Sequence, residues 1–181
     1  MKSPEQERRE VVTRLTEAAD ILSESMDVRF VPSIGANIAY AIKGARDGCD
    51  VAAVPGGLRV YSGRIHFSGT CAFDSGEEIV RTVLTVMKFD PVMRSVAIIA
   101  YSKEFLDVLA DMFIECCEID RTRAVPQNSA MDWGIASCCS EGVPEVISDK
   151  GTKEGNGVIY IIGEDAVEVA NNIIILSHRI Q

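Results

Sequence analysis

Helical and extended segments alternate along the whole chain, and this alternation constrains the fold more than any other feature. Apolar residues recur at helical spacing in residues 4–25 and 166–177. Short apolar runs typical of buried strands lie between the helical segments, and residues 95–101 form the clearest of them. No fixed-period repeat or low-complexity linker divides the chain. We therefore expect a single α/β domain over residues 1–181, with the N-terminal helix of residues 1–27 packed on it.

The other segments predict more helices and a sheet that is partly antiparallel. The runs 58–61 and 64–67 flank Ser62-Gly63, a pattern typical of a tight hairpin. Ser75 and Glu78 have the spacing of a helix-capping box. We also expect helices at residues 37–45, 74–89, 102–113 and 130–140, and strands at residues 50–54, 114–119, 145–148 and 158–162.

Charge and hydropathy exclude several classes of function. The 18 basic and 27 acidic residues give a formal net charge of −9. Such a field repels phosphate backbones, so we expect no nucleic-acid binding by this chain alone. A small anionic ligand needs only local donors and is compatible with that charge. No apolar run approaches the roughly 18 residues of a membrane span, and the polar start does not resemble a signal peptide. We expect a cytoplasmic protein that does not bind membranes.

The cysteines and histidines predict no metal centre. The six cysteines include two adjacent pairs but no CxxC motif, and only His66 and His178 supply imidazole. We expect the cysteines to be small residues of a reduced core rather than a disulfide framework. No metal or other cofactor is expected.

Several loops combine residues that are suited to binding a phosphate. Glycine and small polar residues gather at residues 33–37, 55–57, 75–76 and 151–157, where free backbone N–H groups can hold an anion. Tight turns are the alternative explanation of these glycines. Lys153 and Glu154 in the last loop, and Arg121 and Arg123 after a strand, are either ligand contacts or solvated surface residues. Trp133 either stacks on a heteroaromatic ring or packs over the edge of the core.

Short motifs in a fixed order resemble the ThiN family of thiamin-phosphate synthases. They are Val31-Pro32-Ser33-Ile34-Gly35-Ala36-Asn37, Asp50-Val51-Ala52-Ala53-Val54-Pro55-Gly56, Lys88-Phe89-Asp90-Pro91 with Arg94, Tyr101-Ser102, Asp120-Arg121, Trp133-Gly134 and Lys153-Glu154. This family occurs at the C-terminus of archaeal phosphomethylpyrimidine kinases, fused to DNA-binding domains, or alone. The resemblance implies a three-layer α/β/α fold with a mixed, partly antiparallel sheet, similar to class II sugar-phosphate aldolases. It also implies a reaction that joins hydroxymethylpyrimidine diphosphate to thiazole phosphate.

Two departures from the family pattern bear on that activity. Synthase members carry an arginine directly after the Pro-Gly turn and a histidine in the segment that opens the next helix; here the positions hold Gly57 and Glu78. Losing a cation and a proton donor from a site that handles a diphosphate weakens catalysis, although Arg59 or Arg64 offers a substitute cation.

Three hypotheses follow from the resemblance and its departures. The leading one is a non-catalytic domain that binds thiamin phosphate or a related phosphorylated metabolite and can form a homodimer. The expected ligand contacts are Gly35, Asn37, Gly56, Arg121, Lys153 and Glu154. The second hypothesis is an active synthase with a rearranged site. The third, an aldolase-like metal lyase, requires a histidine cluster that two separated histidines do not supply.

Overall fold

A computed structural model describes residues 1–122, 132–152 and 155–180. The helices are α1 (Pro4–Ser25), α2 (Glu78–Phe89), α3 (Lys103–Asp111), α4 (Trp133–Cys139) and α5 (Ala166–Ser177), with 3-10 turns η1 (Val28–Phe30) and η2 (Gly48–Asp50). The strands are β1 (Asn37–Ala41), β2 (Val51–Ala53), β3 (Arg59–Tyr61), β4 (Arg64–His66), β5 (Ala72–Phe73), β6 (Ser95–Ala100), β7 (Cys116–Glu118), β8 (Val146–Asp149) and β9 (Val158–Gly163).

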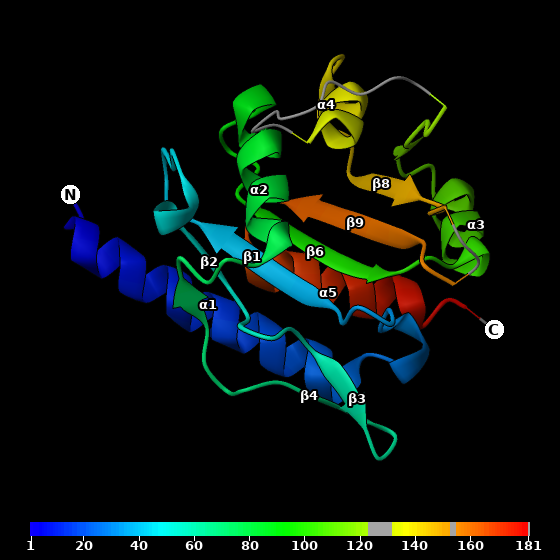
Figure 1. Cartoon of the computed structure of the whole chain (residues 1–181), viewed down its shortest axis with the longest axis horizontal. Helices are drawn as coiled ribbons and strands as arrows, with labels where there is room; N and C mark the ends of the chain where they lie inside the picture. Colours follow the sequence, from blue (N-terminus) through cyan, green and yellow to red (C-terminus); the bar gives the residue numbers. More distant parts are fainter. Residues whose placement is uncertain (123–131, 153–154, 181) are drawn as a thin grey trace.

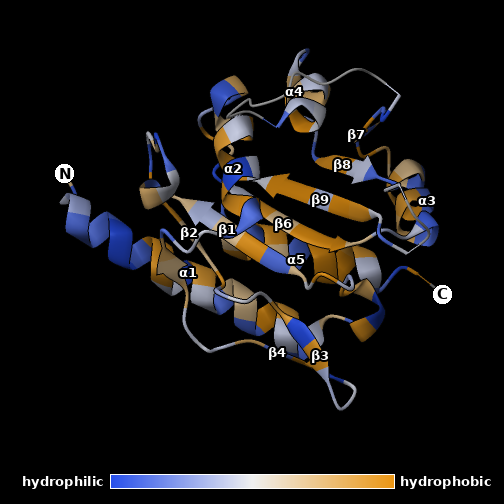
Figure 2. Ribbon diagram, viewed as in Figure 1, coloured by the Kyte–Doolittle hydropathy of each residue, from blue (hydrophilic) through white to orange (hydrophobic). Residues whose placement is uncertain are grey.

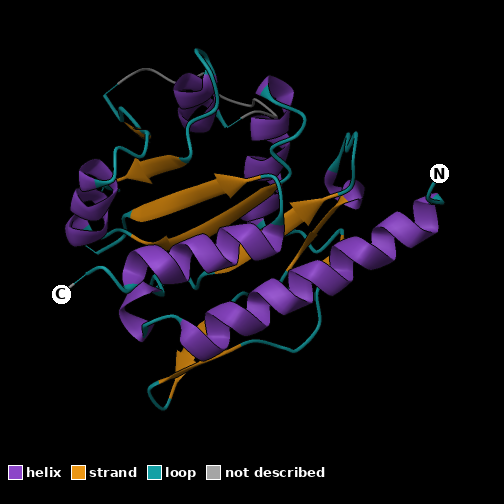
Figure 3. Ribbon diagram, turned by 180° about the vertical axis from the view of Figure 1, so that it is seen from behind, coloured by secondary structure: helices purple, strands orange, loops and turns teal. Residues whose placement is uncertain are grey.

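Seven strands form one mixed sheet between two layers of helices, which confirms the expected fold class. Their order is β5-β2-β1-β6-β9-β8-β7, and every neighbouring pair is antiparallel except β7 with β8. Helices α2 and α4 cover the face seen in Figure 1, and α1 and α5 lie side by side on the opposite face in Figure 3. Helix α3 packs beside edge strand β7 and contacts α5. The expected hairpin forms as the separate β3–β4 ribbon.

Apolar side chains on both faces of the central strands fill two cores. In β1, Ile38 and Tyr40 join the core under α1 and α5, whereas Ala39 and Ala41 join the core under α2 and α4. Strands covered on both faces are apolar throughout, and Figure 2 shows this for β6 and β9. No helix in the described ranges is long and apolar enough to cross a membrane.

The N-terminal helix follows its sequence signals. Ser3 caps α1 by accepting from the Gln6 N–H, and the Gln6 side chain accepts from the Ser3 N–H, which completes a capping box. The apolar stripe of α1 is buried, and Leu15 and Leu22 are fully buried. Each such leucine contributes about 1.5–3 kcal/mol of burial free energy, so α1 is an integral part of the core.

Three expectations about local structure were wrong. Residues 37–45 do not form a helix: Asn37–Ala41 is strand β1, in which all five residues are buried by helices on both faces. Because every residue of this strand is buried, its sequence shows neither a helical nor an alternating period. The Ser75–Glu78 capping box does not form either, because α2 begins at Glu78 with Glu77 as a cap that makes no side-chain hydrogen bond. Finally, the cysteines are not all reduced, since Cys117 and Cys138 form a disulfide.

Candidate functional site

A row of side chains crosses four adjacent strands on the face covered by α2 and α4. Asn37 of β1 lies opposite Ile98 of β6, Ile98 lies opposite Tyr160 of β9, and Tyr160 lies opposite Ile147 of β8. Paired residues of neighbouring strands point to the same face. Asp149 ends β8 two residues beyond Ile147 and therefore shares this face. The row brings polar groups from distant parts of the chain to one end of the sheet.

Carboxylates from three parts of the chain act electrostatically on the Tyr160 phenol, and Arg121 opposes them. Glu78 is the first residue of α2, and Asp132 caps α4 while its backbone N–H donates to Thr85 Oγ1 over 3.3 Å. Burial raises the pKa of Tyr160 most, and the negative charges of Asp132, Asp149 and Glu78 raise it further. Tyr160 therefore keeps its proton across the physiological range and offers a hydrogen-bond donor inside an acidic environment.

Arg121 forms a bidentate ion pair with Asp149. Its Nε donates to Asp149 Oδ1 over 2.6 Å and its terminal nitrogen donates to Oδ2 over 2.5 Å. Burial opposes the ionisation of Asp149, but the hydrogen bonds from Arg121 and from the Gly151 N–H outweigh it and hold the pKa of Asp149 below its usual value. The residue expected to clamp an external anion thus clamps a carboxylate of the same chain. Its side chain remains 47% exposed, so one edge of the guanidinium can still meet a ligand.

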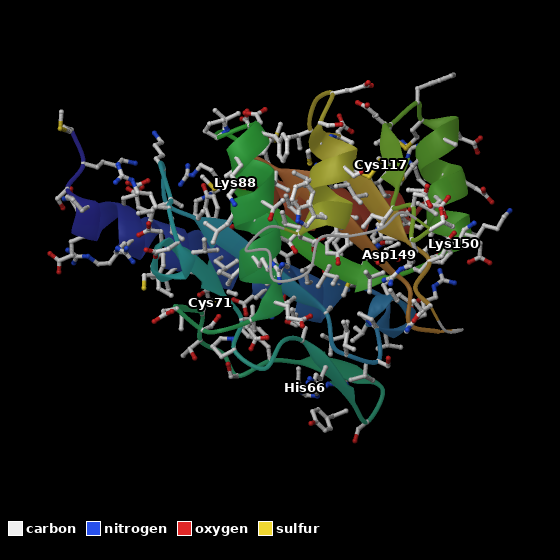
Figure 4. The ribbon with its side chains drawn as sticks, turned by 45° about the horizontal axis from the view of Figure 1, so that its top comes forward. His66, Cys71, Lys88, Cys117, Asp149 and Lys150 are labelled. Atoms are coloured by element: carbon white, nitrogen blue, oxygen red, sulfur yellow. A yellow bond between two sulfur atoms is a disulfide. The ribbon has the colours of Figure 1, made fainter. Side chains whose placement is uncertain are left out.

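A hollow opens beside this ion pair at the end of β8. It has a volume of about 390 Å³ and is lined by Glu118, Ile119, Asp120, Arg121, Lys150 and Gly151. The Lys150 ammonium pairs with Glu118 over 3.2 Å, and both side chains are more than half exposed. Figure 4 shows Asp149 and Lys150 next to each other at this end of the sheet. The hollow therefore adds a second cation close to Arg121.

The Asn37 side chain, an expected ligand contact, is engaged within the chain. Its Nδ2 donates to the Val54 carbonyl over 2.9 Å, and its Oδ1 accepts from the backbone N–H groups of Ile38 (2.8 Å) and Val54 (3.1 Å). Only 7% of the residue is exposed. These bonds fix the start of β1 to the turn that follows β2, so Asn37 positions that turn.

The backbone donors expected at two glycines are also engaged. Gly35 N–H donates to the Pro32 carbonyl over 2.8 Å, which closes a turn. Gly56 N–H donates to Glu77 Oε1 over 2.9 Å. An external anion at Gly56 has to displace the Glu77 carboxylate that already occupies this donor.

The family pattern has an arginine where this chain has Gly57, and the geometry of the turn shows what a side chain at this position requires of the backbone. Gly57 has φ +71°, and a Cβ at this position would stand 2.7 Å from the Ala36 carbonyl oxygen. A side chain here requires the turn to move. The guanidinium of Arg59 reaches the same turn, because its Nε donates to the Gly56 carbonyl over 3.0 Å.

Part of the expected site lies outside the described residues. Arg123, Lys153 and Glu154 belong to this group, so their predicted contacts remain predictions. Trp133 is the first residue of α4 and is 41% exposed. This partial exposure is compatible both with stacking on a ligand ring and with packing over the edge of the core.

The described part of the chain contains no group of three His, Cys, Asp or Glu side chains that could hold a metal ion. Figure 4 places His66 on the β3–β4 ribbon, far from Asp149, and His178 caps the C-terminus of α5. Neither histidine lies in the row that contains Tyr160.

The family model for thiamine-phosphate synthase ThiN matches residues 14–175, which is most of the chain. The chain belongs to the ThiN family. It is 30% identical over 169 residues to the bifunctional thiamine biosynthesis protein ThiDN of Methanocaldococcus jannaschii, covering 92% of this chain but only 40% of that protein. It is 25% identical to the thiamine-phosphate synthase ThiN of Methanothermobacter thermautotrophicus, covering 88% of each chain.

Solved structures agree with this assignment at the level of the fold. The C-terminal domain of phosphomethylpyrimidine kinase superposes with a TM-score of 0.83 at 24% identity, covering 94% of this chain and all of that domain. A sugar-phosphate aldolase of Thermotoga maritima superposes with a TM-score of 0.56 at 12% identity, covering 94% of this chain and 92% of the aldolase. The ThiN domain therefore has the fold that its sequence motifs implied.

Sequence reasoning missed three groups of this ThiN domain's candidate site. Tyr160 is the polar-tipped residue of an otherwise apolar strand, and Asp149 ends a short strand next to a glycine-rich loop. Asp132 directly precedes α4 in the position of an N-cap. Each signal is visible in the sequence, but only the strand register and the position of α4 bring the three residues to one site.

Proposed function

We propose that this ThiN-family domain binds thiamin phosphate or a related phosphorylated metabolite and lacks synthase activity. The observation that carries the proposal is the set of carboxylates whose charges act on Tyr160, namely Glu78, Asp132 and the Arg121-paired Asp149. Glu78 stands where the family pattern has a histidine. Carboxylates attract a cationic ring and repel a diphosphate group. Thiamin phosphate carries a permanently charged thiazolium ring, so it suits this environment better than a diphosphate substrate does.

The arrangement of charges suggests an orientation for the ligand. The cationic thiazolium and the aminopyrimidine would lie near the carboxylates and the Tyr160 hydroxyl. The phosphate would lie toward the exposed edge of Arg121 and toward Lys150 in the adjoining hollow. The predicted phosphate contact of Lys153 belongs to the loop that follows.

Calorimetric titration of the purified chain with thiamin phosphate tests the proposal. We expect saturable binding to the wild type, about tenfold weaker binding to Tyr160→Phe, and weaker binding to Glu78→Gln, because one lost hydrogen bond or charge contact corresponds to about 1.4 kcal/mol. His66→Ala on the distant ribbon serves as the matched control. If thiamin phosphate, its diphosphate and the two precursors all fail to bind, the proposal is wrong.

One observation favours an active synthase as the second candidate. The Arg59 guanidinium already contacts the turn after which synthase members carry their arginine, so it is placed to supply the missing cation. Under this alternative the purified chain forms thiamin phosphate from its two precursors. Activity would fall by roughly two to three orders of magnitude in Arg59→Ala and would be abolished in Lys153→Ala. Steady product formation that is lost in these two variants would overturn the binding proposal in favour of an active synthase.

Two substitutions would restore the residues of the family pattern, and the backbone accommodates only one of them. Glu78 is one of the two departures from the family pattern. It is the first residue of α2 and is exposed, so Glu78→His is compatible with the backbone. Gly57→Arg is not, because of the left-handed φ and the Ala36 carbonyl. Product formation by the Glu78→His variant alone would indicate that Arg59 has taken over the role of the family arginine.

A further inference from the structure

We propose that the Cys117–Cys138 disulfide is a reversible thiol–disulfide site that fixes Arg121 and Asp132 at the candidate site. Its effect on ligand affinity rests on the proposed function, whereas its effect on the placement of α4 does not. A dithiol, either small or carried by a protein, is the chemical class of reductant that would act on it.

The disulfide joins the two elements that lead into and out of the segment carrying these residues. Cys117 lies in β7 and Cys138 in α4, 21 positions apart. Arg121 follows Cys117 by four residues, and Asp132 precedes Cys138 by six. The charges of both residues act on Tyr160, and the charge of Asp132 also acts on Arg121. The disulfide therefore links β7 to α4. Arg121, which follows β7, and Asp132, which caps α4, both act on Tyr160.

Few other interactions join these two elements directly, because α4 packs mainly on α2 and β7 mainly on β8. Strand β7 is at the edge of the sheet and pairs only with β8. Helix α4 has seven residues, of which Ile135, Ala136 and Cys139 are buried. Gly134 packs against Ile119 so closely that an added Cβ would lie 3.1 Å from Ile119 Cγ2. Besides the packing of α4 on α2 and the hydrogen bond from Asp132 to Thr85, the placement of α4 against the end of β7 thus depends on this close contact and on the disulfide.

The disulfide is accessible at this edge. Cys117 and Cys138 are both partly exposed, and Figure 4 shows Cys117 on the side of the sheet that carries α4. Reduction breaks the S–S bond and transfers two electrons and two protons from the dithiol, which leaves as its own disulfide. Attack on a disulfide requires a thiolate.

The neighbouring cysteines do not compete for this exchange. Burial raises the pKa of Cys139 to about 11 and also raises the pKa of Cys116. Both therefore remain thiols at neutral pH and attack the disulfide slowly. The exchange consequently depends on an external dithiol rather than on reshuffling within the chain.

Trp133, the only tryptophan of the chain, reports the position of α4 without any ligand. The experiment compares air-oxidised protein with protein reduced by dithiothreitol, measuring Trp133 emission and the calorimetric affinity for thiamin phosphate. We expect reduction to shift the emission to longer wavelength and to weaken binding about tenfold, with both changes reversed by re-oxidation. Unchanged emission, or changed emission with unchanged affinity, overturns the proposal.

Two variants separate the disulfide from general effects of reduction. Cys117→Ser should match the reduced wild type and no longer respond to dithiothreitol, whereas Cys116→Ser should respond as the wild type does. Far-UV circular dichroism checks that each variant is folded, and reduced wild type replaces Cys117→Ser if that variant does not fold. If neither redox form binds thiamin phosphate, the proposed function fails. Trp133 emission then decides by itself whether the disulfide fixes α4.

Discussion

Gly56 and Gly57 share a left-handed backbone but differ in their surroundings. Their φ angles are +75° and +71°, yet a Cβ at Gly56 meets no atom within 4 Å, whereas a Cβ at Gly57 stands 2.7 Å from the Ala36 carbonyl oxygen. We expect Gly56→Ala to lower the free energy of unfolding by about 1 kcal/mol through φ alone, and Gly57→Ala by about 2–3 kcal/mol because the turn must also move. Urea denaturation measures both values. Equal losses would show that the contact with Ala36 relaxes freely.

The lowered pKa of Asp149 predicts that the folded protein loses stability at acidic pH. Its folded pKa lies below its unfolded value because Arg121 and the Gly151 N–H stabilise the carboxylate. Such a group adds stability above its unfolded pKa of about 4, and this contribution is lost as the pH falls through the folded pKa. We expect Asp149→Asn to be less stable than the wild type at pH 7, with the difference shrinking as the pH falls from about 4 through the lowered folded pKa. A difference that stays constant over this range would contradict the expectation.

At the scale of elements, Asp165 joins α5 to α1. It caps α5 by accepting from the N–H groups of Val167 and Glu168, and it accepts two hydrogen bonds of 2.6 and 2.7 Å from Arg14 of α1. We expect Asp165→Ala to cost about 1–2 kcal/mol in thermal unfolding, mostly through the lost cap. Arg14→Ala should cost less than about 1 kcal/mol, because the arginine is 44% exposed and the pair is screened by water. A larger loss in Arg14→Ala would assign the stability to the ion pair instead.

Elements with a strong local signal were predictable from the sequence, and those determined by their surroundings were not. Helix α1 begins with a capping box and a helical apolar stripe, and α3 begins at the Ser102 cap, which accepts from the Phe105 N–H. Strand β1 was read as a helix because burial on both faces removes any period from Asn37–Ala41. The same limit applies to the site: no local pattern shows that the charges of Asp132 and Glu78 act on Tyr160.

Across the whole molecule, the strand order explains why the site is assembled from distant residues. Strands β1, β6, β9 and β8 are neighbours in the sheet, although other elements separate β1, β6 and the β8–β9 pair in the chain. The register places Asn37 and Tyr160 in one row, while α2 and α4 add Glu78 and Asp132 from the layer above. The sheet thus provides the base of the site, and the beginnings of α2 and α4 add the carboxylates of Glu78 and Asp132 above it.

The disulfide should also affect the stability of the whole molecule. It closes a loop with a sequence separation of 21 residues, and restricting the unfolded chain over a loop of this size is worth about 3 kcal/mol. We expect reduction to lower the free energy of unfolding by roughly this amount in urea denaturation, with the chain still folded because both cores remain intact. Cys138→Ser should show the same loss and no further effect of dithiothreitol. Identical curves for oxidised and reduced wild type would mean that the segment between the two cysteines stays ordered in the unfolded state or that the bond strains the native one.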